Sequence, residues 1–193
     1  MGFAVQRATT NADATSVANT LELDVWQFYV YTYSESDGPR IYKNGVEVSY
    51  EPNSRTVGEG ATGNDSAENF GIGNDVSAPT TQAFDGLIDD VRVYNRVLSS
   101  DEIKRLYRIG ATMKINKPSY TGLDSGLVGY WSFDGPDMAG NTAADRSGQG
   151  NNGTLTNGPM RAVGRIGQAL DFDGVDDYTS HGDVDAFDAL GAL

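Results

Sequence analysis

The sequence predicts an all-β protein with one short helix near residues 99–108. Residues 26–33, WQFYVYTY, alternate with the period of two that is typical of a strand. The dipeptide Asn44-Gly45 lies between RIYK and VEVSY, and it supplies the two positive φ angles of a type I′ hairpin turn. Beyond residue 127, further strand-like segments are separated by clusters of Gly, Asn and Asp. We therefore expect antiparallel sheets.

The single helix is predicted from its first turn. Ser99 opens the run Ser-Ser-Asp-Glu, so that Ser99 and Glu102 form a capping box in which each side chain satisfies a backbone donor near the other. Ile103, Leu106 and Tyr107 follow at helical spacing and form one apolar stripe.

Composition excludes several classes of protein. The chain has 193 residues, enough for one well-buried sandwich or for two incomplete pieces. It lacks cysteine, which excludes disulfides and thiolate metal sites. Its net charge of −13 argues against nucleic acid as a partner, and it contains no apolar run of the roughly 20 residues that a membrane span needs.

Two blocks of the chain resemble parts of a known domain. Residues 84–107, FDGLIDDVRVYNRVLSSDEIKRLY, resemble the closing segment of a bacterial LamG-like domain of the concanavalin A-like lectin/glucanase superfamily. Residues 127–178, from LVGYWSFDG to GQALDFDGVDDY, resemble the opening segment of the same kind of domain. The resemblance implies an antiparallel jelly-roll β-sandwich. The segment that resembles the end of the domain precedes the segment that resembles its beginning. The sandwich is therefore either circularly permuted or split between two repeats.

The predicted domain organisation follows from this order. Residues 1–110 are the C-terminal portion of one LamG-like sandwich, residues 111–126 are a linker, and residues 127–193 are the N-terminal portion of another. The two portions either complete one sandwich or belong to separate domains of a larger modular protein.

A structural calcium ion is implied by the strand IDDVRVY. Alternation places Asp89 on the face of Val91 and Val93, where a carboxylate costs several kcal/mol unless it is paired or bound to metal. The strand resembles the terminal strand of related glucanases, in which the aspartate helps to hold calcium. Asp134 and Asp173, each within a Phe-Asp-Gly turn, are the expected companion ligands. The alternative for Asp89 is an acceptor of backbone N–H groups at a bulge.

Three tyrosines are the candidate ligand-binding residues. Tyr29, Tyr31 and Tyr33 share one face of a strand, and sugar rings stack on such aromatic side chains. The alternative is that they serve only cross-strand packing. The two tryptophans, Trp26 and Trp131, are expected in the core.

The sequence argues against an enzyme. His181 is the one histidine, with no nucleophile motif beside it, and Gln27 stands in ELDVWQ where a glycosidase strand would need its second carboxylate. The resemblance implies a non-catalytic carbohydrate-binding or adhesion module of a secreted or cell-surface bacterial protein. Its partner would be a glycan or a surface protein. The alternative functions are a structural spacer repeat without a ligand and, less favoured, a glycoside hydrolase.

Overall fold

The computed structural model describes residues 2–5, 12–18, 20–60, 69–76, 83–111 and 122–184. The chain divides into two compact units. Unit 1 contains residues 1–64, 96–118 and 189–193, and unit 2 contains residues 65–95 and 119–188.

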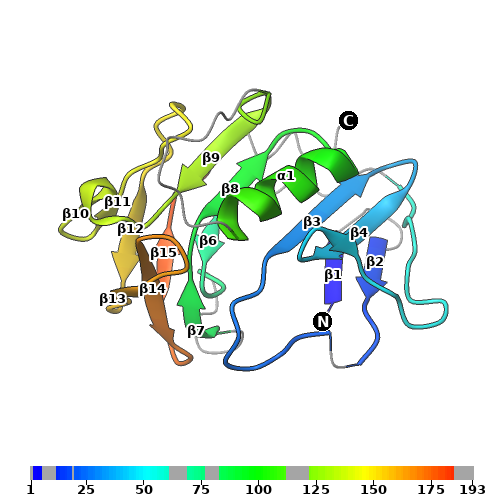
Figure 1. Cartoon of the computed structure of the whole chain (residues 1–193), viewed down its shortest axis with the longest axis horizontal. Helices are drawn as coiled ribbons and strands as arrows, with labels where there is room; N and C mark the ends of the chain where they lie inside the picture. Colours follow the sequence, from blue (N-terminus) through cyan, green and yellow to red (C-terminus); the bar gives the residue numbers. More distant parts are fainter. Residues whose placement is uncertain are drawn as a thin grey trace. The chain divides into compact units, whose positions relative to one another are not determined.

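Unit 1 is built from two small antiparallel sheets and a helix (Figure 1). The first sheet pairs β1 (Gly2–Val5) with β2 (Ala12–Thr15). The second has the order β3-β4-β5, with bounds Tyr29–Ser34, Gly38–Lys43 and Val46–Glu47. Asn44 and Gly45 join β4 to β5 with φ angles of 52° and 82°, which confirms the predicted hairpin.

Helix α1 (Ser100–Ala111) begins at the predicted capping box. The Ser99 N–H donates to Glu102 Oε2 at 2.9 Å, and the Glu102 N–H donates to Ser99 Oγ at 3.3 Å. Ile103 and Leu106 are buried in unit 1, as the apolar stripe predicted, and Tyr107 lies against Phe28 with ring centroids 6.1 Å apart.

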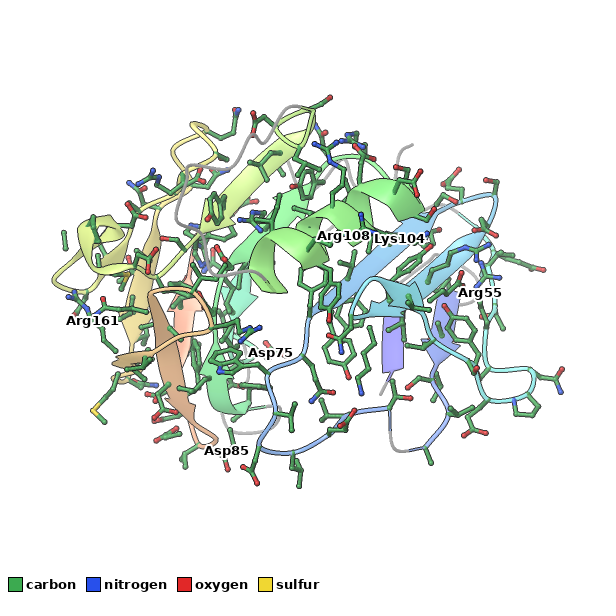
Figure 2. All side chains as sticks on the ribbon, viewed as in Figure 1. Arg55, Asp75, Asp85, Lys104, Arg108 and Arg161 are labelled. Atoms are coloured by element: carbon green, nitrogen blue, oxygen red, sulfur yellow. The ribbon has the colours of Figure 1, made fainter. Side chains whose placement is uncertain are left out.

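The other side of α1 is polar. Lys104 and Arg108 are exposed there (Figure 2). The helix is therefore amphipathic, and its sequence pattern matches its environment.

The prediction that Trp26 is a core residue was wrong. Trp26 is 38% exposed and precedes β3, which begins only at Tyr29. The Gln27 amide accepts the Glu22 N–H and donates to the Glu22 and Val25 carbonyls, while Asp24 has a φ of 58°. These contacts hold the segment in a loop, so the strand period does not extend back to Trp26.

Unit 2 contains three groups of antiparallel strands. In the first group the order is β10 (Met138–Ala139), β11 (Thr142–Ala143), β12 (Gly153–Thr156), β15 (Tyr178–Ser180) and β6 (Gly71–Ile72). In the second the order is β13 (Met160–Val163), β14 (Gln168–Asp173) and β7 (Asp85–Ile88). The third pairs β8 (Val91–Tyr94) with β9 (Leu127–Trp131), and a short 3₁₀ helix, η1 (Gly135–Asp137), follows β9.

Strands from the two sequence blocks pair with each other inside unit 2. β8 pairs antiparallel with β9, with Val91 opposite Trp131. β7, which precedes it, pairs antiparallel with β14, with Ile88 opposite Leu170. Strands β7 and β8 belong to residues 84–107, and they thus lie beside β14 and β9, which belong to residues 127–178.

One apolar cluster fills unit 2. Trp131, Phe133, Leu170 and Phe172 are almost fully buried within it, together with Ile72, Met138 and Ala143. The Trp131 indole N–H donates to the Asn151 carbonyl at 2.8 Å, so the buried ring keeps its polar group paired. Burial of Trp131 confirms the prediction for the second tryptophan.

The predicted all-β class, an antiparallel jelly-roll β-sandwich with one short helix, is confirmed. The compact units divide the chain differently from the blocks 1–110 and 127–193, because residues 65–95 belong to unit 2. Whether those blocks derive from one repeat or two stays a prediction. The predicted linker, 111–126, lies largely outside the described residues.

The packing of the Trp131 ring over Gly129, two residues earlier in β9, can be tested by substitution. A Cβ atom at this buried position would collide with the Trp131 ring. We expect Gly129→Ala to lower the free energy of unfolding by about 2 kcal/mol, because overpacking forces strand and ring apart. Urea unfolding measures the change. Gly110→Ala, in open space on α1, is the control and should leave stability unchanged or raise it by less than about 1 kcal/mol. An unchanged Gly129→Ala midpoint would contradict the packing described.

Candidate functional site

Asp89 lies where β7 ends and β8 begins, in unit 2. The following residue, Asp90, has a φ of 55°, which interrupts the strand at this point. Asp89 Oδ2 accepts the Ile166 N–H at 2.9 Å, whereas Asp89 Oδ1 is buried with no hydrogen-bond partner. Desolvation, with a smaller contribution from Asp90 and Asp134, raises the pKa of Asp89 to about 6. The carboxylate is therefore only partly satisfied.

Asp134 approaches the same turn from the end of β9. Its Oδ1 accepts the Gln168 N–H at 2.8 Å, two residues after the N–H that Asp89 accepts. The turn can approach both carboxylates because it contains two glycines, which lack a Cβ atom. A Cβ at Gly164 would meet Asp89 Oδ2 at 2.7 Å, and one at Gly167 would collide with Asp134. Two carboxylates thus converge on residues 164–168.

Gln168 adds a third oxygen at this place. Its Oε1 is buried without a hydrogen-bond partner and lies beside Gly135, the residue after Asp134. Among the described residues, Asp89 Oδ1 and Gln168 Oε1 are the two buried side-chain atoms that lack a partner. Carboxylate and amide oxygens are the ligands that calcium prefers, so this set of donors fits the ion. We name it the Asp89 cluster: Asp89, Asp134 and Gln168.

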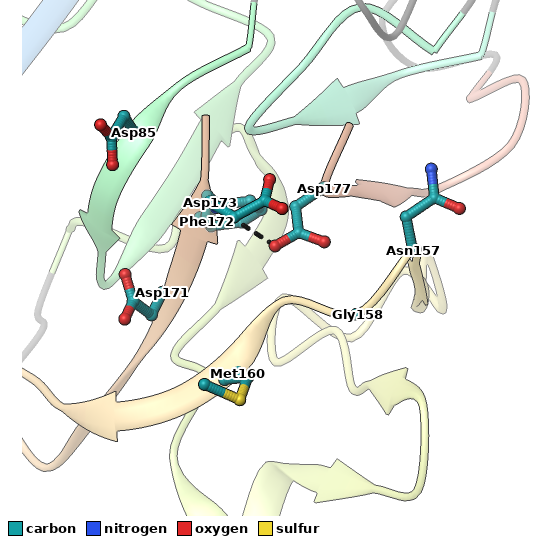
Figure 3. A pocket seen from close by; sticks show the side chains of 8 residues that line it. All are labelled: Asp85, Asn157, Gly158, Met160, Asp171, Phe172, Asp173 and Asp177. Atoms are coloured by element: carbon teal, nitrogen blue, oxygen red, sulfur yellow. Dashed lines mark hydrogen bonds between the residues drawn. The ribbon is translucent and has the colours of Figure 1, made fainter. Parts of the chain in front are cut away.

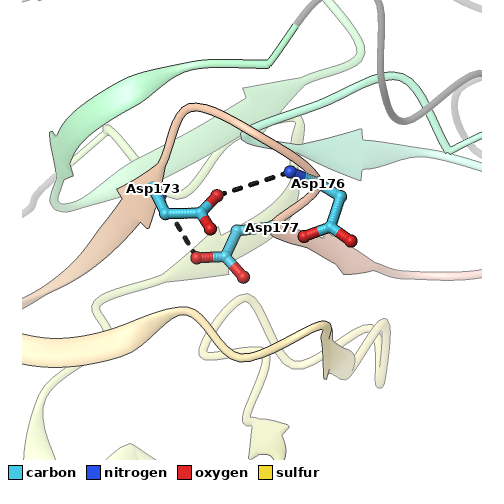
Figure 4. A group of neighbouring side chains, drawn as sticks. All are labelled: Asp173, Asp176 and Asp177. Carbon is cyan, nitrogen blue, oxygen red and sulfur yellow. Dashed lines mark hydrogen bonds between the residues drawn. The ribbon is translucent and has the colours of Figure 1, made fainter.

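Asp173 does not join the Asp89 cluster. It ends β14, and Gln168 begins that strand, so about 16 Å separate the two at the usual rise per residue. Asp173 instead lies with Asp176 and Asp177, whose carboxylate oxygens can approach to within 4.8 Å of one another (Figure 4). Of the three predicted metal ligands, the structure brings together Asp89 and Asp134 only.

A cavity of about 400 Å³ opens beside Asp173 (Figure 3). Its polar side chains are all acidic or amide: Asp85, Asn157, Asp171, Asp173 and Asp177. Met160 and Phe172 supply apolar lining. We call it the acidic pocket.

The three predicted tyrosines lie on β3 in unit 1. The rings of Tyr29 and Tyr31 are stacked, with centroids 6.4 Å apart and planes 17° apart. Tyr31 is 42% exposed, although desolvation and then Tyr29 raise the pKa of its hydroxyl to about 12. Tyr33 is half-buried, and Ile41, opposite Tyr31, is fully buried. Only part of this face is therefore open.

Polar groups adjoin the tyrosine pair. The Tyr29 hydroxyl donates to the Thr20 carbonyl at 2.9 Å and lies 3.0 Å from Gln27 Oε1. Lys43, opposite Tyr29 in the ladder, donates to the same Thr20 carbonyl at 2.7 Å and pairs with Glu22. Gln27 and Glu22, the positions weighed for glycosidase chemistry, thus hold the loop and the lysine.

His181 is a core residue. Its ring lies 4.1 Å from that of Trp131, and a Cβ at Gly153 would collide with it. Nε2 lies 2.9 Å from the Thr179 hydroxyl and Nδ1 lies 3.4 Å from the Asn151 carbonyl, which can only accept. Burial lowers the pKa of His181 to about 4.

Three functional candidates were not predicted from the sequence. Gln168 carries no pattern that marks it, because its role depends on an unpaired oxygen in a packed turn. Asp85 belongs to the first of the three Phe-Asp-Gly tripeptides in the chain, so the repeat of this tripeptide was the available signal. Asp177 follows Asp176 in an acidic run, which shows charge but not burial.

Comparison with known proteins agrees with this architecture. A laminin G family model, described as the concanavalin A-like lectin/glucanases superfamily, matches residues 1–104, more than half of the 193-residue chain. The chain belongs to this family. Neither the curated proteins nor the solved structures gave a significant match. Residues 127–178 lie outside the matched range, so their resemblance to an opening segment stays a prediction.

The buried histidine predicts a pH dependence of stability. Between pH 6.5 and about 4, His181 is protonated in the unfolded chain but not in the folded chain. The free energy of unfolding therefore decreases as the pH is lowered, by up to about 3 kcal/mol. His181→Phe keeps a ring beside Trp131 and cannot titrate. Urea unfolding of both proteins from pH 7.5 to 4 should show a stability difference that shifts in favour of His181→Phe as pH falls. A difference that does not vary with pH would contradict the burial of His181.

Proposed function

We propose that this chain is a non-catalytic carbohydrate-binding or adhesion module of a secreted or cell-surface bacterial protein. The observation that carries the proposal is the stacked pair Tyr29–Tyr31, with one ring partly exposed and polar groups beside it. Family membership supports it, although the superfamily also contains glycosidases and fold alone does not decide activity. No helix in the described part of the chain has the length and apolarity to cross a membrane.

The tyrosine pair has the features of a sugar platform. The apolar C–H face of a saccharide stacks on an aromatic ring, and neighbouring polar groups orient its hydroxyls. Tyr31 would supply the ring, while Tyr29 and Gln27 would supply hydrogen bonds at its edge. Tyr33 extends the same strand face but is less open. The ligand that we propose is a glycan, either free or attached to a surface protein.

We further propose that calcium has a structural role at the Asp89 cluster. Asp89, Asp134 and Gln168 would hold the ion. Its positive charge would offset the repulsion between the Asp89 and Asp134 carboxylates. Its support is the pair of buried oxygens without partners. Asp89 follows β7, Asp134 follows β9 and Gln168 begins β14, so the bound ion would connect segments of both sequence blocks.

The glycan proposal is tested by substitutions at Tyr31. Tyr31→Ala removes the ring and should weaken glycan binding about 5-fold, since an aromatic contact contributes on the order of 1 kcal/mol. Tyr31→Phe is the matched control, because it keeps the ring, and it should retain affinity. A glycan array followed by calorimetry on the hits measures both. An array without any hit would favour a spacer repeat.

The calcium proposal is tested at Asp89. Without calcium at pH 7, Asp89→Asn should raise the free energy of unfolding by roughly 2 kcal/mol, because it removes a desolvated charge whose pKa is raised to about 6. The wild type should gain about 3 kcal/mol when calcium is 100-fold above its dissociation constant, and the variant should gain nothing. Asp124→Asn, an exposed site in unit 2, should respond to calcium as the wild type does. Equal calcium responses in wild type and Asp89→Asn would contradict the proposal.

A further inference from the structure

The acidic pocket offers hydrogen-bond acceptors and no positive charge. Asp85, Asp171, Asp173 and Asp177 contribute carboxylates, and none of the described residues that line the cavity is Lys, Arg or His. The Asn157 side-chain amide donates one N–H to the Asp176 carbonyl at 2.8 Å, and its oxygen adds a further acceptor. A ligand for this cavity must therefore be rich in donors.

The strand register places the carboxylates on one face. Asp173 lies directly opposite Asp85 in the β14–β7 ladder, and Asp171 lies two residues back on the same face. Met160 lies opposite Asp171 in the β13–β14 ladder. Like charges directly opposite each other destabilise a sheet, so a bound cation would relieve this repulsion.

Asp177 points to a ligand independently of the surface charge. It is only 5% exposed, and Oδ2 accepts the Asp173 N–H at 3.2 Å. Oδ1 has no hydrogen bond from any described residue and lies 4.0 Å from the position of a Cβ on Gly158, at the cavity wall (Figure 3). Desolvation, and then Asp173, raises the pKa of this carboxyl group. Asp177 is thus a largely buried side chain whose second oxygen is open to the cavity.

We propose that the acidic pocket binds an amino sugar through its free ammonium group. The ammonium would lie between Asp173 and Asp177, ring hydroxyls would donate to Asp85 and Asp171, and the Met160 side chain, 69% exposed, would cover an apolar ring face. Charge repulsion excludes uronic acids and sialic acids. The inference rests on the proposed function and names the class of glycan for a site in unit 2.

A metal ion fits the pocket less well than an organic cation does. Asp173 Oδ1 already accepts the N–H groups of Val175 and Asp176, at 2.8 and 3.4 Å. Calcium requires six to eight oxygens at about 2.4 Å, whereas the cavity of about 400 Å³ has the size of a small-molecule site.

The experiment is calorimetry of the full chain with three probes: a β-1,4-linked glucosamine tetrasaccharide, its fully N-acetylated counterpart, and calcium chloride alone. The glucosamine tetrasaccharide should bind at least 10-fold more tightly than the acetylated one, and added salt should weaken it. Asp85→Asn and Asp171→Asn, both at exposed positions, should weaken it at least 10-fold. Asp124→Asn makes the same charge change away from the pocket and should not.

The inference is overturned by equal affinity for the two tetrasaccharides, by an equal loss of affinity in Asp124→Asn, or by binding heat from calcium alone that Asp85→Asn and Asp171→Asn abolish. Equal affinity would show that the ammonium group has no role. An equal loss in Asp124→Asn would show non-specific attraction to a chain of net charge −13, and calcium heat that depends on Asp85 and Asp171 would show a metal site. If neutral glycans bind through Tyr31 while the glucosamine tetrasaccharide does not bind, the pocket inference fails and the proposed function stands. If no saccharide binds, both fail.

Discussion

The pairing of β7 and β8 with β14 and β9 is the constraint on which unit 2 depends. These ladders join segments about 40 and 80 residues apart in the chain, as Val91 opposite Trp131 and Ile88 opposite Leu170 show. Each sequence block alone would leave strand edges unpaired, and unpaired edges invite association with other chains. Together the ladders enclose Trp131 and Phe172, and the apolar cluster around these rings gives the unit its buried core.

The same closure brings carboxylates close together and partly removes one of them, Asp89, from water. Because β7 ends against the turn before β14, Asp89 is carried to residues 164–168 and meets Asp134 there. A desolvated carboxylate costs free energy unless a partner compensates for it. At the other end of β14, Asp85 and Asp173 stand opposite each other for the same reason of register. One ladder thus creates an acidic site at each of its ends.

Local patterns in the sequence were sufficient for local structure. Asn44-Gly45 requires left-handed backbone, and the Ser99–Glu102 box satisfies donors within one turn, so both could be predicted without knowledge of the fold. Trp26 could not, because its exposure depends on hydrogen bonds from Gln27 that end the strand early. Asp134 was predicted from its turn, while Gln168 required knowledge of which buried oxygen lacks a partner.

The sequence by itself therefore determined the β class, the capped helix, the hairpin and the net negative charge of the chain. These properties depend on backbone propensity and charge, which act within a few residues. Tertiary structure alone decided that Asp89 and Asp134 converge while Asp173 lies at the far end of β14, and that Asp177 faces a cavity. Such placements depend on the register between distant strands, and a shift of one residue would move each side chain to the opposite face.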